Sequence, residues 1–114
     1  MEFKNWLISV IQKKFKDYKD IKANIGERRF DYKGFYPDII LASHGITVAL
    51  VQVETEESLK DIDRPKVWKD LASLGPRLIL MVPAEWKSRV SEMIWQEGLI
   101  NKVSIGTYEL VVKL

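Results

Sequence analysis

The stretch 37–54, PDIILASHGITVALVQVE, decides the fold of this chain. Two apolar runs rich in β-branched residues, 37–43 and 46–54, are separated only by His44 and Gly45. A two-residue break containing glycine between two strand-like runs predicts a tight β-hairpin, with His44 as a turn residue. The second run is apolar at both parities until its last three residues, which is typical of a strand buried on both faces. We therefore expect the hairpin at the centre of a sheet.

Helix-like and strand-like patterns alternate on both sides of the predicted hairpin. Before it, apolar residues at helical spacing predict a helix over 2–18, and the run 21–25 predicts a short strand. The polar stretch 26–34, GERRFDYKG, has neither helical nor strand periodicity. After the hairpin, the sequence predicts a helix opened by Pro65 and stopped by Gly75-Pro76, a strand at 77–82, a helix at 85–97 and one or two strands within 103–114.

Each predicted helix has an apolar side that should face the sheet. Three of the four tryptophans lie on these sides and fit helix–sheet packing. Trp95 lies on a different side of its helix, where exposure would indicate a protein interface. The apolar stripe of the first helix is expected to consist of Phe3, Trp6, Leu7, Val10, Ile11, Phe15 and Tyr18.

Composition limits the class of protein and the chemistry open to it. The chain has 114 residues, of which 46% are hydrophobic and 30% charged, and this balance predicts one folded domain over 1–114. No apolar run reaches the ~18 residues of a membrane span, and the charged N-terminal segment does not resemble a signal peptide. We therefore expect a cytoplasmic protein without a membrane partner. With no cysteine and one histidine, any metal would need oxygen ligands, as magnesium, manganese and calcium do.

Charge is distributed unevenly although the net charge is only +2. Residues 1–33 hold nine basic and five acidic side chains, residues 34–63 one and six, and residues 64–114 eight and five. An acidic centre between basic flanks is typical of a metal site framed by phosphate-binding surface. Chance clustering on a solvated surface explains the same pattern equally well.

The predicted elements and two short motifs resemble the PD-(D/E)XK, or restriction-endonuclease-like, superfamily. The motifs are Tyr-Pro-Asp-Ile-Ile-Leu at 36–41 and Val-Gln-Val-Glu-Thr at 51–55, on the two strands of the hairpin. They are similar to the family arrangement of Pro-Asp, a hairpin and Glu-x-Lys-Thr. The resemblance implies a restriction-endonuclease-like αβββαβ core, with a central mixed sheet flanked by helices. It also implies a hydrolase that acts on DNA with Mg²⁺ or Mn²⁺.

Hairpin geometry brings the candidate site residues together. Gln52 and Glu54 share one face of their strand because side chains alternate, and the tight turn places Asp38 opposite them. Carboxylates converging on a divalent metal would polarise a phosphodiester and activate the attacking water. On this interpretation Asp38, Gln52 and Glu54 are catalytic residues that hold the metal. The resemblance adds Glu27, as the upstream glutamate that often completes such sites.

The candidate site departs from the family pattern at two positions. The family has an acid where this chain has Gln52 and a lysine where it has Glu54. Glutamine still offers a carbonyl oxygen to a hard cation. Glutamate cannot supply the positive charge that a lysine offers to a developing phosphorane, although some family members work with an acid or amide there.

Each candidate residue also has a purely structural explanation. Asp38 could be a turn residue at the start of a strand, and Gln52 could satisfy backbone groups at the end of one. Glu54, Glu56 and Glu57 could form a solvated acidic loop, with one of them capping the segment that follows.

Two basic clusters flank the candidate site and could contact phosphates. Four lysines near the N-terminus, at 13, 14, 16 and 19, instead fit a solvated helix face. The two clusters are Arg28, Arg29 and Lys33 before Asp38, and Arg64, Lys66 and Lys69 after Glu54.

Two functions remain open at this point. The chain is a metal-dependent nuclease or nuclease-like subunit acting on DNA, or it is an inactive nuclease-like fold that serves as a nucleic-acid- or protein-binding module. An active site needs Gln52 and Glu54 to point at Asp38 in a cleft that admits phosphate. A binding module would show these groups scattered, or paired with Arg28 or Arg64. Because a chain this short buries only about two-thirds of its unfolded surface, and small nucleases of this fold commonly act as pairs, we also expect a homodimer.

Overall fold

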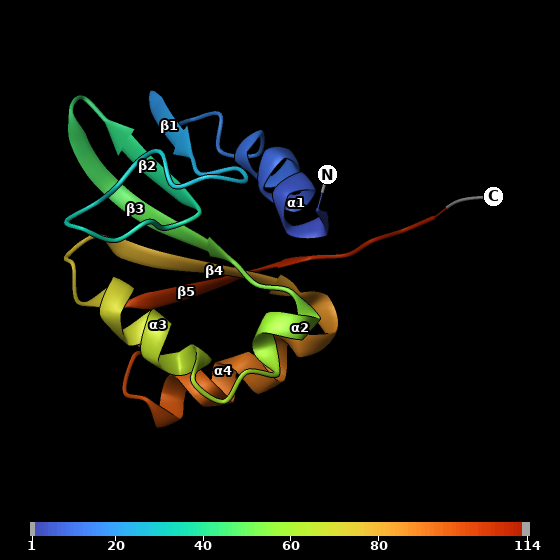
Figure 1. Cartoon of the computed structure of the whole chain (residues 1–114). Helices are drawn as coiled ribbons and strands as arrows, with labels where there is room; N and C mark the ends of the chain where they lie inside the picture. Colours follow the sequence, from blue (N-terminus) through green and yellow to red (C-terminus); the bar gives the residue numbers. More distant parts are fainter. Residues whose placement is uncertain (1, 113–114) are drawn as a thin grey trace.

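A five-stranded mixed sheet forms the centre of the molecule (Figure 1). The structure is a computed structural model that describes residues 2–112. The sheet has the order β1-β2-β3-β4-β5, in which β1, β2 and β3 pair antiparallel and β3, β4 and β5 pair parallel. Its strands are β1 (Asp20–Ala23), β2 (Ile39–Ser43), β3 (Ile46–Val53), β4 (Arg77–Pro83) and β5 (Val103–Tyr108). The α/β class and the central mixed sheet are therefore as predicted.

The predicted hairpin is confirmed as β2 and β3, and β3 is the middle strand of the sheet. His44 and Gly45 form its turn with φ values of 54° and 79°. Positive φ at both central residues is the geometry of a type I′ turn, whose twist matches that of the flanking strands. The second half of β3 is buried throughout, as its continuous apolar pattern indicates.

Helices cover the two faces of the sheet unequally (Figure 1). Helix α1 (Phe3–Gln12) is the only helix of the described residues on one face, where it packs on a core that includes Ile39, Leu41 and Val51. The opposite core includes Leu50, Trp68 and Val90. The elements on that face are α2 (Glu56–Leu59), α3 (Arg64–Ala72), the 3₁₀ turn η1 (Ala84–Trp86) and α4 (Lys87–Gln96).

The first helix is shorter than predicted, and its buried side is different. It ends at Gln12, and residues 13–18 continue as turns from which Phe15 and Tyr18 still pack against the core. The buried residues of α1 are Leu7, Ile8 and Ile11, whereas three members of the predicted stripe are exposed: Phe3, Trp6 and Val10. The prediction was wrong here because it assigned every apolar residue to one buried stripe. Because α1 is a single helix on a wide sheet, the side of α1 that carries these three residues is not covered by another element of the described residues.

The remaining predicted elements occur close to their expected positions. The sequence did not predict the short helix α2. The predicted strands within 103–114 reduce to β5, after which residues 109–112 run on outside the sheet, and residues 113–114 lie outside the described part. No helix of residues 2–112 combines the length and the apolarity that crossing a bilayer requires.

Candidate functional site

Asp38 and Gln52 meet at the open end of the β2–β3 hairpin. Ile39 of β2 pairs with Val51 of β3, so the residue before one lies across from the residue after the other. The backbone N–H of Asp38 donates to Oε1 of Gln52 at 3.3 Å, and both residues are buried. The hairpin therefore brings these two candidate residues together, and Gln52 uses its carbonyl oxygen to satisfy a backbone donor.

The Asp38 carboxylate is held by the protein around it. The backbone N–H of Val53 donates to its Oδ2 at 2.7 Å, and Nζ of Lys4 on α1 lies 3.3 Å from the same oxygen. Burial raises the pKa of Asp38 above its ordinary value, while Lys4 and the Val53 N–H act in the opposite direction. The net effect is upward, so the loss of hydration outweighs the two partners that stabilise the charge.

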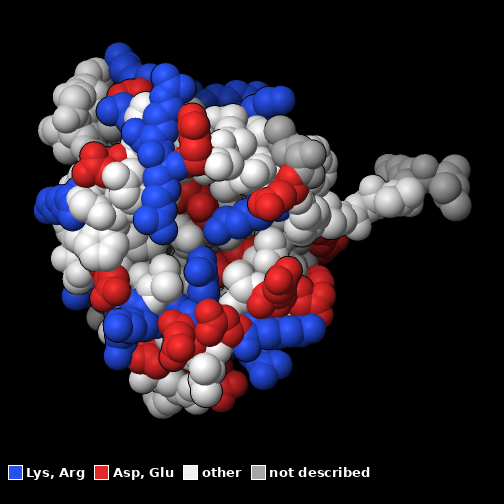
Figure 2. Space-filling view, in the orientation of Figure 1, with Lys and Arg blue, Asp and Glu red and all other residues white. Residues whose placement is uncertain are grey.

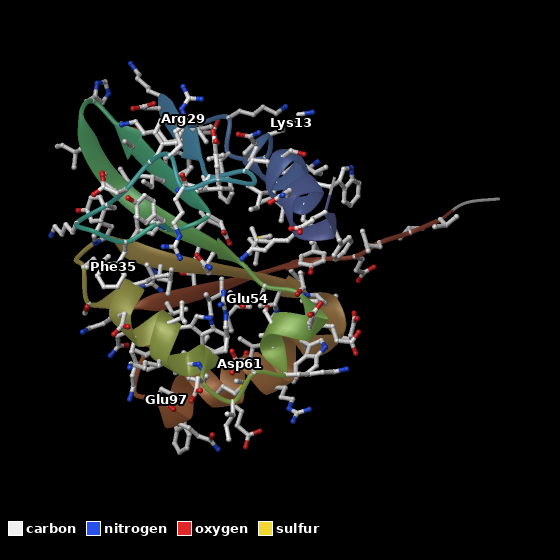
Figure 3. The ribbon with its side chains drawn as sticks, in the orientation of Figure 1. Lys13, Arg29, Phe35, Glu54, Asp61 and Glu97 are labelled. Carbon is white, nitrogen blue, oxygen red and sulfur yellow. The ribbon has the colours of Figure 1, made fainter. Side chains whose placement is uncertain are left out.

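The Glu54 carboxylate is fully buried and makes a two-pronged ion pair with Arg64. Nε of Arg64 donates to Oε1, and Nη2 donates to Oε2 at 2.7 Å. Ser58 Oγ donates to Oε1 at 2.8 Å, and Trp68 Nε1 donates to Oε2 at 3.3 Å. Figure 3 shows Glu54 in the space between the sheet and helices α2 and α3. Both carboxylate oxygens of Glu54 thus accept hydrogen bonds from side chains of the protein itself.

The position of Glu54 joins three elements at the end of β3. Its backbone N–H donates to the carbonyl of Met81 on β4, and its carbonyl accepts from the hydroxyl of Tyr108 on β5 at 2.7 Å. Burial raises the pKa of Tyr108 to about 12. Thr55 and Ser58 form a capping box at the start of α2, so the Glu54 side chain supports this cap through Ser58.

Glu27 shares a hollow with Asp38 and not with the Glu54–Arg64 pair. It is exposed on the loop between β1 and β2, and it lines a hollow together with Lys4, Arg28 and Asp38. Within residues 2–112, no group of three or more His, Cys, Asp or Glu side chains is arranged to hold a metal ion. Of the carboxylates expected to bind Mg²⁺ or Mn²⁺, Asp38 is paired with Lys4 and Glu54 with Arg64.

Residues 24–36 form an irregular loop next to Asp38 (cyan in Figure 1). Asn24 is buried, and its side chain anchors the loop at both ends. Its Oδ1 accepts from the N–H groups of Arg29 and Phe30 at 2.9 and 2.7 Å, and its Nδ2 donates to the carbonyls of Phe30 and Pro37 at 2.8 and 2.7 Å. This one side chain satisfies four backbone groups, so the loop has a defined shape.

Three cations of the loop lie over aromatic rings of the same loop. The guanidinium of Arg28 is 5.5 Å from the centre of the Tyr36 ring, and that of Arg29 is 5.3 Å from the centre of Phe30. Lys33 Nζ lies 5.4 Å from the centre of Tyr32. Arg28, Arg29, Phe35 and Tyr36 are exposed, so the loop presents both charge and aromatic surface to solvent.

The six basic residues expected to contact phosphates have different surroundings. Arg64 pairs with Glu54, Lys69 lies 2.7 Å from Glu97, and Lys33 donates to the carbonyl of Leu74 at 2.8 Å. Arg28 and Arg29 contact aromatic rings and remain exposed, as does Lys66 on α3. The loop cluster is therefore more accessible to a ligand than the α3 cluster.

Two residues that shape this region were not singled out in the sequence. Lys4 reaches Asp38 from α1, and no local pattern links positions so far apart. Asn24 carried a weak signal, because asparagine before a glycine turn often bonds to backbone groups that follow it.

Comparison with known proteins found no match for this chain among protein-family models, curated proteins or solved structures.

Proposed function

We propose that this chain is a nuclease-like domain that binds nucleic acid without cutting it. The observation that carries the proposal is the ion pair between Glu54 and Arg64, which is the arrangement expected of a binding module. A carboxylate with four internal contacts cannot also bind a catalytic metal unless the Arg64 pair is broken. Breaking a buried ion pair typically costs about 3–5 kcal/mol.

The nuclease-like part of the proposal has support from the order of the elements. A helix, a strand and a hairpin precede α3 and β4, with Pro37-Asp38 immediately before the first strand of the hairpin and Gln52 on the second. Similarity of fold does not by itself imply cleavage, because function belongs to the site. We therefore take the hairpin residues as structural supports in a fold used for binding.

The ligand surface that we propose is the 24–36 loop. Surfaces that bind a nucleic-acid strand combine cations for the phosphates with aromatic rings on which bases stack. Arg28 and Arg29 supply the cations, and the exposed rings of Phe35 and Tyr36 supply the stacking surface. Figure 2 shows a band of Lys and Arg side chains through the middle of this face. Exposed rings favour a strand with unpaired bases over a duplex.

The experiment is a titration of labelled oligonucleotides followed by fluorescence anisotropy. The oligonucleotides are a single-stranded DNA, its RNA equivalent and a duplex of the same length. We expect the single strands to bind more tightly than the duplex. The double variant Arg28→Ala/Arg29→Ala should weaken binding at least about tenfold, because it removes two phosphate-contacting cations.

Arg89→Ala is the matched control for this titration. Arg89 also lies over an aromatic ring, with its guanidinium 5.0 Å from the centre of Trp86, but it belongs to α4. We expect this variant to bind as the wild type does. Equal losses in both variants would indicate nonspecific attraction, and an absence of binding to any oligonucleotide would favour a protein partner instead.

A cleavage assay tests the other half of the proposal. Plasmid and single-stranded DNA incubated with millimolar Mg²⁺ or Mn²⁺ should stay intact, and the melting temperature of the chain should not rise with either metal. Cleavage that disappears in Asp38→Asn would overturn the proposal. It would restore the metal-dependent nuclease as the function.

A further inference from the structure

An uncovered apolar surface runs from α1 to the segment that follows β5. On α1 it consists of Phe3, Trp6 and Val10, which share the flank that does not face the sheet. The rings of Phe3 and Trp6 are stacked with their centres 6.3 Å apart. Phe3 and Leu110 line one hollow, which connects the helix to the C-terminal segment. We call the set of Phe3, Trp6, Val10, Leu110, Val111 and Val112 the α1–tail surface.

The α1–tail surface has the size of the largest apolar patches found on monomers, which are often functional. Trp6 is 45% exposed, Leu110 56% and Val112 85%. With aromatic side chains contributing about 150–250 Å² each, the six residues leave roughly 500 Å² of apolar surface open. Apolar patches of about 300–600 Å² are the largest on a typical monomer and are often functional. A standard interface buries about 800 Å² on each partner, so the α1–tail surface would supply most of one.

Opposite charges lie at the two ends of α1, beside its exposed apolar flank. The hollow at its Phe3 end is lined by Glu56, Glu85 and Glu109. At the other end of α1 the chain continues through Lys13 and Lys14, both exposed. Figure 2 shows acidic side chains around the base of the projecting C-terminal segment, and Figure 3 shows Lys13 beyond the far end of α1. Along α1 the surface is therefore acidic at the Phe3 end, where the tail residues depart, apolar along the flank of the helix and basic beyond Val10.

We propose that the α1–tail surface is the interface through which two copies of this chain associate about a two-fold axis. A two-fold interface brings the same patch of each copy together in opposite directions. The acidic end of one copy then meets Lys13 and Lys14 of the other, at both ends of the contact, while the apolar middle pairs with itself. A patch of one charge throughout would repel its own image, whereas this charge distribution is complementary to it.

This surface is distinct from the proposed ligand surface. Asn5, on the opposite flank of α1, accepts from the N–H of Gly26 in the 24–36 loop, so the two flanks of the helix serve the two surfaces. The inference stands independently of the proposed nucleic-acid binding.

Sedimentation equilibrium of the whole chain tests the interface. The wild type should dimerise at tens of micromolar. Trp6→Glu should weaken the dimer at least about thirtyfold, the effect of losing a central aromatic anchor. Val112→Asp provides a second variant at a highly exposed position, and circular dichroism should show that both variants keep the fold.

Trp95→Glu is the matched control, because Trp95 is 69% exposed on α4, across the sheet from α1, and an interface at Trp95 would be separate from the α1–tail surface. It should leave the dimer unchanged. A dimer broken by Trp95→Glu and not by Trp6→Glu would place the interface on α4 and overturn the proposal. So would a wild type that stays monomeric at several hundred micromolar.

Charge reversal tests the two-fold geometry itself. Two double variants are needed, Lys13→Glu/Lys14→Glu and Glu85→Lys/Glu109→Lys. Each should weaken its own self-association by about tenfold or more, since like charges then face each other. An equimolar mixture of these two double variants should associate, because opposite charges face each other at both ends. Failure of the mixture to associate, with wild-type dimers present, would contradict the antiparallel arrangement.

Discussion

At the scale of single residues, the buried pair of Glu54 and Arg64 connects the end of β3 to the start of α3. Arg64 is itself mostly buried, so neither charge can be rehydrated easily when its partner is lost. A buried ion pair does not by itself imply net stabilisation, since burying both charges is costly. Removing one partner is different, because it leaves an uncompensated charge in the interior.

We predict that Arg64→Met lowers the free energy of unfolding by about 3–5 kcal/mol. The double variant Glu54→Met/Arg64→Met should cost less than the sum of the two single changes, since no unpaired charge remains. Urea unfolding of the four proteins in a double-mutant cycle measures the coupling. Additive losses would mean that the pair contributes nothing beyond its packing.

Asp38 should make the stability of the chain depend on pH. Its folded-state pKa is raised above 3.8 by burial, so the folded protein binds the proton more tightly than the unfolded chain does. The stabilising effect of this proton is complete below pH ~3.8, the unfolded value, and is lost as pH rises through the folded value. At neutral pH the ionised Asp38 is therefore a net cost to folding.

Asp38→Asn is accordingly predicted to raise the free energy of unfolding at pH 7. The gain should shrink as the pH falls and vanish below pH ~3.8, where the wild-type carboxyl is protonated in both states. Urea unfolding between pH 3 and 8 makes the comparison. If Asp38→Asn destabilises at pH 7, the ion pair with Lys4 outweighs the burial of the charge.

Sequence patterns fixed the positions of the hairpin residues more firmly than their partners, for which Arg28 and Arg64 were both left open. Asp38 and Gln52 could be placed opposite each other because strand alternation and a two-residue turn fix their register. The pairing of Glu54 with Arg64 depends on how α2 and α3 return to the sheet, and no periodicity encodes that path.

At the scale of elements, the 24–36 loop is held by one side chain, Asn24. Asn24→Ala removes four bonds to backbone groups and should lower the free energy of unfolding by about 1–3 kcal/mol. It should also weaken oligonucleotide binding, since Arg28 and Arg29 lose their fixed positions. Thermal unfolding and anisotropy measure the two effects.

Asn5→Ala is the control for the loop variant. It removes a single bond to an exposed glycine, at 3.0 Å, and should change stability by less than Asn24→Ala does. Equal effects of the two substitutions would show that Asn24 does not organise the loop.

Element types were predicted more successfully than buried faces. The hairpin, β4 and α4 follow from runs and periods that packing reinforces. The face of α1 that is buried depends on the width of the sheet beneath it, which a local pattern cannot supply. Phe3, Trp6 and Val10 were therefore assigned to a core that does not extend to them.

At the scale of the whole molecule, nucleic-acid binding should depend strongly on salt. Each phosphate contact on a single strand contributes about 0.7 to the slope of log K against log salt. Arg28→Ala/Arg29→Ala should reduce the magnitude of that slope by about 1.4, and Arg89→Ala should leave it unchanged. Anisotropy titrations at several salt concentrations give the slope. A slope that the loop substitutions leave unchanged would mean that the loop does not contact phosphates.

The α/β class and the mixed sheet follow from the sequence because β3 is apolar on both faces and sits in the middle of the sheet. The sequence does not predict which residues belong to which of the two proposed binding surfaces. Residues of α1 contact both the 24–36 loop and the α1–tail surface. Only the folded arrangement shows that Asn5 contacts the loop and that Trp6 belongs to the α1–tail surface.

The bonding of Asn24 has a kinetic consequence as well. The N–H groups of Arg29 and Phe30 belong to an irregular surface segment, yet both are bonded to one buried oxygen. Their exchange with deuterium requires the same local opening, so the two amides should share one protection factor. The exchange of these two neighbouring amides would therefore report the opening of the loop. Any ligand that binds the loop should slow the exchange of both amides by the same factor.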